Sequence, residues 1–392
     1  MRIALISTHD TGENAGALRP AYMRFGGARI VERQLDLALA TGCKTIACLA
    51  STVGREVIEL QHRSENAGAK FVALRDPLAL AGLVTAADDL MVIAPGLLPD
   101  EAVVLRHAGK PAVLAFHADA AVPLGYERID ADLAWAGVLF VRGAAVERLA
   151  ELPPDSDIPS ALLRIALQSG VRPVVLDHSL LDEGAWHLNA TQAQLEEREA
   201  RWIRSHSELA PFTAPGLAVS ERMGARIAHD VLGKPSARVP WIGAAVAGIV
   251  ALGLAILEMP AIGLGFAALG TIFASMGEVI ERIGQGGKAD GQRTMLARVV
   301  DGLLDPILVI LIALASPEAE GWLRLFVPAV LFGLLHLGRR WARARWRRTY
   351  ADRVTLAIML APAAFFGLVQ PVAAVLALAV LISLFFAPPA SE

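Results

Sequence analysis

Two aspartates, Asp301 and Asp305, stand four residues apart inside a long run of apolar residues. In a helix this spacing places both carboxylates on one face, where their like charges repel. Near the middle of a membrane each carboxylate costs roughly 2.5–3.5 kcal/mol on insertion scales, so the pair needs a compensating cation. A divalent metal ion is the cation that we expect, and ion pairs with Arg293 and Arg298 are the alternative.

The elements that must position this pair lie in the second half of the chain. Hydrophobic residues make up 55% of the sequence, which is high for a soluble protein, and they concentrate after residue 240. Six stretches there approach the length of a membrane span: 240–258, 260–280, 299–316, 321–338, 353–370 and 371–388. The sequence therefore predicts an all-α bundle of six transmembrane helices over residues 240–392.

The orientation of this bundle follows from the connection at 338–353, which carries seven arginines. The positive-inside rule places such a connection on the cytoplasmic side. With six spans, both termini and the connection at 281–298 are then cytoplasmic too, in a multi-pass protein of the inner membrane. Beside a span, arginines interleaved with Trp341 and Trp346 favour contact with anionic lipid headgroups over nucleic acid.

The first half, residues 1–212, alternates short apolar runs with amphipathic segments. Strands are expected at 3–7, 44–49, 90–93, 112–116, 137–141 and 174–176. Helices are expected at 28–41, 53–66, 100–108, 143–151 and 158–169. This order predicts a cytoplasmic α/β domain with an open, Rossmann-like sheet, whose ligands bind at the carboxyl ends of the strands.

The chain contains two cysteines, Cys43 and Cys48, within or beside an expected strand. Their number and spacing support neither a disulfide framework nor a zinc ribbon. We expect both to be buried, reduced thiols.

Three segments of the first half resemble sugar-phosphate nucleotidyltransferases. The first joins Arg19-Pro20 to the glycine pair Gly26 and Gly27 and to a helix that ends at Gly42. Residues 88–100 are similar to the strand and turn that carry a metal-binding aspartate in that family, and residues 186–197 to a later segment that often supplies a second acidic ligand. The resemblance implies a nucleotidyltransferase-like fold, with nucleotide contacts at Arg19, Gly26 and Gly27.

The chain departs from that family where the chemistry takes place. The loop at 8–19 has two glycines and two acidic residues, which would repel a triphosphate, in place of a glycine-rich phosphate cradle. Pro95-Gly96 replaces the aspartate at the strand end, and His187 or Asn189 occupies the later acidic position. We therefore expect a domain that no longer activates nucleotides, with an altered but working site as the alternative.

The second half resembles the integral-membrane CDP-alcohol phosphotransferases, whose signature is D-x2-D-G-x2-A-R-x8-G-x3-D-x3-D. Its second part matches Ala297, Asp301 and Asp305, with alanine in place of glycine. The resemblance implies that Asp301 and Asp305 bind a divalent cation, Mg²⁺ or Mn²⁺, and that Asp305 acts as the catalytic base on the acceptor hydroxyl.

The first part of the signature is altered. Glu278 and Glu281 keep the D-x2-D spacing, but Arg282 replaces the next glycine and Gln285-Gly286 replaces Ala-Arg. The resemblance implies that both glutamates are metal ligands, with an ordinary helix end as the alternative. It implies diphosphate contacts for three basic residues: Arg282, Lys288 and Arg298.

Residues 213–239 resemble the amphipathic helix that precedes the first span in the same family, with Arg222, Arg226 and Lys234 at the level of the headgroups. The two fused halves look like the bifunctional enzymes that make CDP-inositol and transfer its inositol phosphate. The implied partners are a CDP-linked donor, an alcohol or lipid acceptor and membrane lipids, with CMP released and no nucleic acid bound.

Two other functions remain open. The altered signature favours a catalytically silent scaffold or regulator that accompanies an enzyme of lipid synthesis, as a homodimer through the bundle. A transporter is less favoured, because the spans show no internal repeat.

Overall fold

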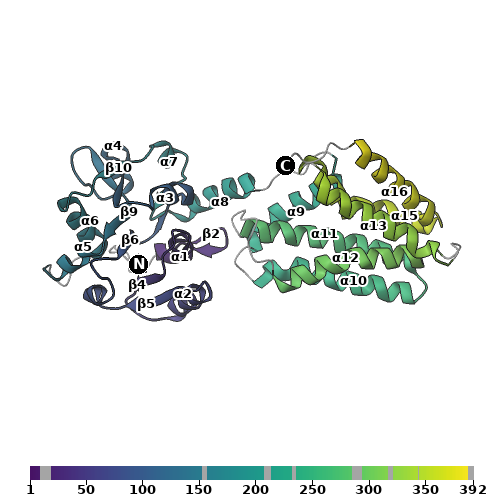
Figure 1. Ribbon diagram of the computed structural model, residues 1–392, viewed down its shortest axis with the longest axis horizontal. Coiled ribbons are helices and arrows are strands. Elements are labelled where there is room, and N and C mark those ends of the chain that lie inside the picture. Colours follow the sequence, from purple (N-terminus) through teal and green to yellow (C-terminus); the bar gives the residue numbers. More distant parts are fainter. Residues whose placement is uncertain are drawn as a thin grey trace. The chain divides into compact units, whose positions relative to one another are not determined.

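The computed structural model describes residues 1–8, 19–151, 157–206, 213–231, 235–284, 294–316, 321–342 and 344–386. The chain divides into two compact units, Met1–Glu199 and Ala200–Glu392 (Figure 1).

The first unit is built on a seven-stranded mixed sheet with the order β10-β8-β9-β6-β1-β4-β5. Its strands are β1 (Arg2–Ser7), β4 (Thr45–Leu49), β5 (Lys70–Leu74), β6 (Asp89–Ile93), β8 (Ala112–His117), β9 (Leu133–Arg142) and β10 (Pro173–Val175). β9 is antiparallel to β6 and β8, while the other neighbouring strands are parallel. The expected α/β open sheet is confirmed, as a mixed sheet.

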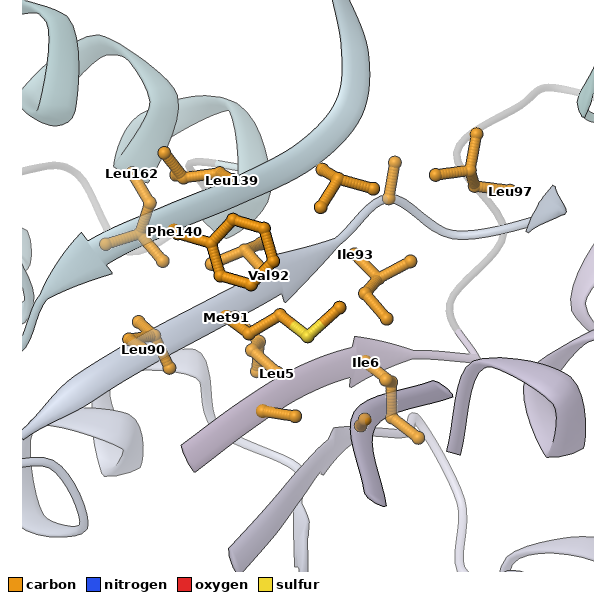
Figure 2. Close-up of a cluster of buried hydrophobic side chains, with 14 of the residues drawn as sticks. Leu5, Ile6, Leu90, Met91, Val92, Ile93, Leu97, Leu139, Phe140 and Leu162 are labelled. Carbon is orange, nitrogen blue, oxygen red and sulfur yellow. The ribbon is translucent and has the colours of Figure 1, made fainter. Parts of the chain in front are cut away.

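The central strands of this sheet are buried on both faces. β1 and β6 are nearly unbroken apolar runs, as expected for strands covered by helices on both sides. Their side chains meet those of β9 and of the helix at 158–168 in one core (Figure 2). This burial is the reason that the positions of β1 and β6 can be predicted from the sequence.

Helices and short hairpins complete the first unit. The helices are α1 (Ile30–Ala40), α2 (Arg55–Asn66), α3 (Glu101–His107), α4 (Ala118–Ala121), α5 (Ala144–Glu147), α6 (Ile158–Gln168) and α7 (Ser179–Asp182), and α8 (Gln192–His206) begins in it. The two-stranded pairs are β2 (Arg24–Phe25) with β3 (Ala28–Arg29), and β7 (Leu97–Leu98) with β11 (His187–Leu188). Short 3₁₀ helices lie at Pro20–Tyr22, Pro77–Gly82, Val122–Leu124 and Arg148–Glu151.

The second unit consists of helices. They are α9 (Pro215–Val231), α10 (Val239–Ile256), α11 (Pro260–Gly284), α12 (Met295–Leu314), α13 (Leu323–Trp341), α14 (Ala344–Tyr350), α15 (Arg353–Phe365) and α16 (Val369–Phe386), with a 3₁₀ turn at Pro235–Arg238. Six of them coincide with the six expected apolar stretches. Among the described residues, three helices are long and apolar enough to cross a membrane: Ser236–Ile256, Pro260–Gly284 and Val369–Phe386. A bundle with six spans therefore remains a prediction.

Small residues allow α10 and α11 to pack closely. A Cβ atom on Gly263 would lie 2.7 Å from the carbonyl oxygen of Ala251, and one on Gly277 would lie 2.8 Å from the indole of Trp241. Close approach of helix backbones through glycine is a common means of association in membranes, where apolar surfaces gain little by leaving lipid. This packing fixes α11, whose last turns carry Glu278, Glu281 and Arg282.

Candidate functional site: an aspartate pair bound by arginines

The aspartate pair lies on α12, as the spacing predicts. The helix begins after Thr294, whose hydroxyl accepts a hydrogen bond of 3.2 Å from the backbone N–H of Ala297. Asp301 and Asp305 follow, about 9 Å and 15 Å along the helix at 1.5 Å per residue. Their side chains are 35% and 27% exposed, so both carboxylates are partly shielded from solvent.

Arg353, the first residue of α15, bridges the two aspartates. Its Nε donates to Oδ1 of Asp305 at 2.6 Å and its Nη2 donates to Oδ2 at 3.0 Å, while Nη1 donates to Oδ1 of Asp301. The planar guanidinium thus engages one carboxylate with two parallel bonds, the strongest geometry for such a pair. The Arg353 side chain is only 18% exposed.

Arg339, near the end of α13, is a second cation at this site. Its Nη1 lies 3.5 Å from Oδ2 of Asp305, and its Nε donates to the carbonyl oxygen of Tyr350 at 3.0 Å. The ring of Tyr350 packs against Gly338, where an added Cβ would come within 2.6 Å of it. Among the described residues, two guanidinium groups therefore lie close to the aspartate pair.

Both arginines escape prediction from the sequence. Arg353 and Asp305 are 48 residues apart in the chain, and only the packing of α13 and α15 against α12 brings the charges together. Of the alternative partners, Arg298 is exposed on α12, and Arg293 lies outside the described residues. One feature of the sequence could have indicated Arg353. It is a charged residue at the start of an apolar stretch, where a charge needs a partner.

The altered half of the signature also forms contacts within the protein. Glu278 accepts a hydrogen bond of 3.3 Å from Arg282, one turn later on α11. Arg282 also lies 3.9 Å from Glu221, which is buried on α9. Glu281 accepts a bond of 2.8 Å from the backbone N–H of Thr294, and so joins the end of α11 to the start of α12. Lys288 lies outside the described residues.

These groups do not fit a divalent metal ion in the arrangement observed. Mg²⁺ requires several oxygen ligands in a strict octahedron. Three of the four oxygens of the aspartate pair accept hydrogen bonds from Arg353. Within the described residues, no three His, Cys, Asp or Glu side chains form a group that could hold a metal.

In the first unit, Gly26 and Gly27 form the two-residue turn between β2 and β3. Both have positive φ angles, of 56° and 79°, as a tight hairpin turn of this type requires. The N–H of Gly26 donates to Glu199 at 3.1 Å, and its carbonyl accepts from Arg33 at 2.8 Å. Protein side chains thus occupy the turn where the resemblance implies nucleotide contacts, while Arg19 is exposed.

The three segments that resemble nucleotidyltransferases meet in the first unit. The N–H of Asn189 donates to the carbonyl of Gly96 at 3.2 Å. A Cβ on Gly96 would lie 2.3 Å from Oδ1 of Asn189 and 2.8 Å from Cβ of Pro20. The buried Gln34 donates to the carbonyls of Ala94 and Leu97 on either side of this glycine, at 3.0 and 2.8 Å. An amide and a glycine thus meet at the positions where the resemblance implies carboxylates.

Comparison with known proteins finds structures of low sequence identity that are similar to about half of this chain. No family model and no curated protein matches the chain. Similar solved structures include a putative glucose-1-phosphate thymidylyltransferase from Bacillus anthracis in complex with a sucrose, with 12% identity and a TM-score of 0.40, over 51% of this chain and 95% of that one.

Two further structures are similar over the same half. The inositol-1-phosphate CTP transferase from T. maritima has 13% identity and a TM-score of 0.37, over 45% of this chain and 86% of its own. A UDP-glucose pyrophosphorylase complexed with UDP-glucose has 12% identity and a TM-score of 0.39, over 52% and 99%. At these values the similarity says nothing about what this chain binds or catalyses.

Proposed function

We propose that this chain is a catalytically silent, membrane-embedded homologue of the CDP-alcohol phosphotransferases, and that it acts as a scaffold or regulator beside an enzyme of lipid synthesis. The observation that supports the proposal is the bridge from Arg353 to Asp301 and Asp305. In the family that the second half resembles, the corresponding carboxylates bind metal ions. Here the guanidinium group of Arg353 donates hydrogen bonds to both carboxylates.

The first unit supports the same proposal by a separate route. Asn189 packs on Gly96 where the nucleotidyltransferases have acidic ligands, and Glu199 and Arg33 bind the backbone of Gly26. Pro95, Gly96 and Asn189 offer no carboxylate to a metal that would neutralise a triphosphate there. The first unit thus lacks carboxylates at these positions, whereas the second unit keeps its carboxylates and binds Asp301 and Asp305 with Arg353.

The membrane location is part of this proposal. Large apolar side chains are exposed along α10 and α16, including Ile249 at 71% and Phe385 at 81%. Contiguous apolar surface of this extent is unfavourable in water and marks contact with lipid or protein. We place the bundle in the membrane, with the arginine-rich connection on the cytoplasmic side.

A second candidate function is transfer of a phospho-alcohol from a CDP-linked donor to an alcohol acceptor, with release of CMP. The spacing and placement of the acidic residues favour it, since Arg339 lies close enough to interact electrostatically with Asp305, Asp301 and Glu278. Acidic residues from both halves of the signature, Glu278 in the first and Asp301 and Asp305 in the second, thus lie within electrostatic range of Arg339. In this candidate Asp305 is the base.

One experiment distinguishes the two candidates. The melting temperature of the purified protein in detergent is measured with CDP or CMP, with and without Mg²⁺ or Mn²⁺, beside an Asp301→Asn/Asp305→Asn variant. A ligand at 100 times its dissociation constant adds roughly 2.7 kcal/mol, which such a measurement detects. For a silent homologue we expect no metal-dependent stabilisation by nucleotide.

Metal-dependent stabilisation that the variant loses would overturn the proposal in favour of the transferase. Stabilisation that persists in the variant would assign nucleotide binding to the first unit, and would contradict the proposal for that unit.

A further inference from the structure

We propose that the guanidinium of Arg353 is a resident cation that replaces a divalent metal ion between Asp301 and Asp305, and that its removal turns the pair into a divalent-cation site. This inference rests on the proposed function and gives it a physical cause. Removal of Arg353 should therefore create metal binding at the aspartate pair and also lower the stability of the protein.

The geometry of the bridge carries the inference. Arg353 contacts both aspartates at once, with two hydrogen bonds to Asp305 and one to Asp301. A single positive centre between carboxylates on successive turns of a helix is the position that a shared metal ion would take. Because the two carboxylates remain on one face of α12 without Arg353, its removal leaves two anionic groups adjacent.

The contacts around the bridge favour a second cation once Arg353 is removed. In the wild type, Arg353 contacts both aspartates, and Arg339 lies 3.5 Å from Asp305. Without Arg353, the pair loses the cation that binds both carboxylates at once. Arg339 is anchored to the carbonyl of Tyr350, so it does not bridge the two aspartates in the arrangement observed.

The start of α15 is held in place by contacts that involve neither Asp301 and Asp305 nor the Arg353 side chain. The preceding residue, Asp352, caps α15 by accepting bonds of 2.9 and 2.7 Å from the N–H and hydroxyl of Thr355. The same carboxylate accepts a bond of 3.1 Å from the N–H of Gly216 on α9. A substitution at Arg353 therefore removes the cation while these contacts keep the start of α15 where it is.

The test compares four full-length proteins in detergent: the wild type, Arg353→Met, Arg353→Lys and the triple variant Arg353→Met/Asp301→Asn/Asp305→Asn. Methionine is similar in length to the aliphatic part of arginine and removes the charge. Lysine keeps the charge but cannot donate two parallel hydrogen bonds to one carboxylate. Melting temperatures are measured in EDTA and with Mg²⁺ or Mn²⁺, and bound Mn²⁺ is counted by electron paramagnetic resonance.

We expect the melting temperature of the wild type to be the same with and without metal. Arg353→Met should melt at a lower temperature in EDTA, recover several degrees with Mn²⁺, and bind one Mn²⁺ per chain that the triple variant does not bind. A loss of packing alone would lower the melting temperature but would create no metal binding. If Arg353→Met is obtained folded only when Mn²⁺ is present during extraction, the proposal is also supported.

Two results would overturn it. One is a folded Arg353→Met protein that binds no more Mn²⁺ than the triple variant; the other is an Arg353→Met protein that is unfolded with and without metal while Arg353→Lys is folded and insensitive to metal. In either case the proposed silent function still stands, because it depends on the wild type alone. Metal binding by the wild-type pair would instead contradict both.

Discussion

At the scale of single residues, Asp305 and Arg353 should depend on each other in their contributions to the free energy of unfolding. Removing one partner of a shielded pair leaves the other charge uncompensated, which costs about 3–5 kcal/mol when burial is complete. Because the two side chains are 27% and 18% exposed, we expect about 1–3 kcal/mol for Asp305→Asn or Arg353→Met.

The double variant should lose less stability than the sum of the two single variants, since neither charge is then left alone. Denaturation of the three variants in detergent tests this coupling. Additive losses would show that the bond seen between Asp305 and Arg353 does not contribute in solution.

The two cysteines provide a second prediction at this scale. Burial raises the pKa of the Cys48 thiol to about 12, and burial also raises the pKa of Cys43. The thiolate is the reactive form, so both groups stay protonated and inert at pH 8. We expect maleimide to modify neither cysteine in the native protein and both after denaturation, as mass spectrometry can measure. Rapid native modification of either one would contradict the burial of β4 and its neighbours.

At the scale of elements, α9 depends on one close contact with α15. A Cβ on Gly216 would lie 2.6 Å from the backbone nitrogen of Thr355 and 2.8 Å from Oδ1 of Asp352. Gly216→Ala should therefore destabilise the second unit by about 1–3 kcal/mol, because backbone has to move. Gly253→Ala on α10 is the matched control, since a Cβ there has nothing within 4 Å.

The control should be neutral or stabilise its helix by up to about 1 kcal/mol, because alanine is the better helix former. Thermal melts of both variants under the same conditions make the comparison. Equal effects of the two substitutions would argue against the observed docking of α9.

Elements with a clear local pattern could be predicted from the sequence. The expected strands at 3–7, 90–93 and 112–116 agree with β1, β6 and β8 to within one residue at either end, because burial on both faces requires continuous apolar runs. β5 escaped prediction: it is an edge strand with a mixed pattern, and one of its five residues, Lys70, is exposed. The hairpin at Gly26-Gly27 also escaped, because its strands have only two residues each.

The candidate site was less predictable than the elements. The spacing of Asp301 and Asp305 correctly placed both on one face of α12, since that is a local property of a helix. Arg339 and Arg353 reach the pair through tertiary packing, which no local period encodes. Gln34 and Glu199 were missed for the same reason, as each binds backbone far away in the chain.

At the scale of the whole molecule, the two units differ in where their large apolar side chains lie. The first has a core of large apolar side chains, such as Trp186 and Phe116, which the hydrophobic effect stabilises in water. The second exposes apolar side chains and packs its helices through glycine and alanine. This difference is the one that we expect if the second unit lies in lipid, as proposed above.

The orientation of the second unit in the membrane can be tested with single added cysteines, because the native thiols are expected to be inert. The two substitutions are Gly321→Cys and Arg340→Cys. Gly321 lies just before α13, and Arg340 lies near its end. We expect a membrane-impermeant maleimide to label Gly321→Cys in intact bacterial cells and Arg340→Cys only after lysis. The reverse pattern would contradict the assignment of the arginine-rich connection to the cytoplasm.

The capping of α9 by Asp352 has a consequence for biosynthesis. Gly216 and Asp352 are 136 residues apart, and Arg353, which bridges the aspartates of α12, is the next residue. During translation the chain reaches α9 and then α12 long before it reaches these partners. Domains tend to fold as they emerge, yet α9 has no cap and Asp301 and Asp305 have no bridge until the ribosome has made residue 353. The nascent bundle is thus incomplete until its last two long helices follow, and a chain that stops before residue 352 leaves the ribosome with its carboxylates unbridged.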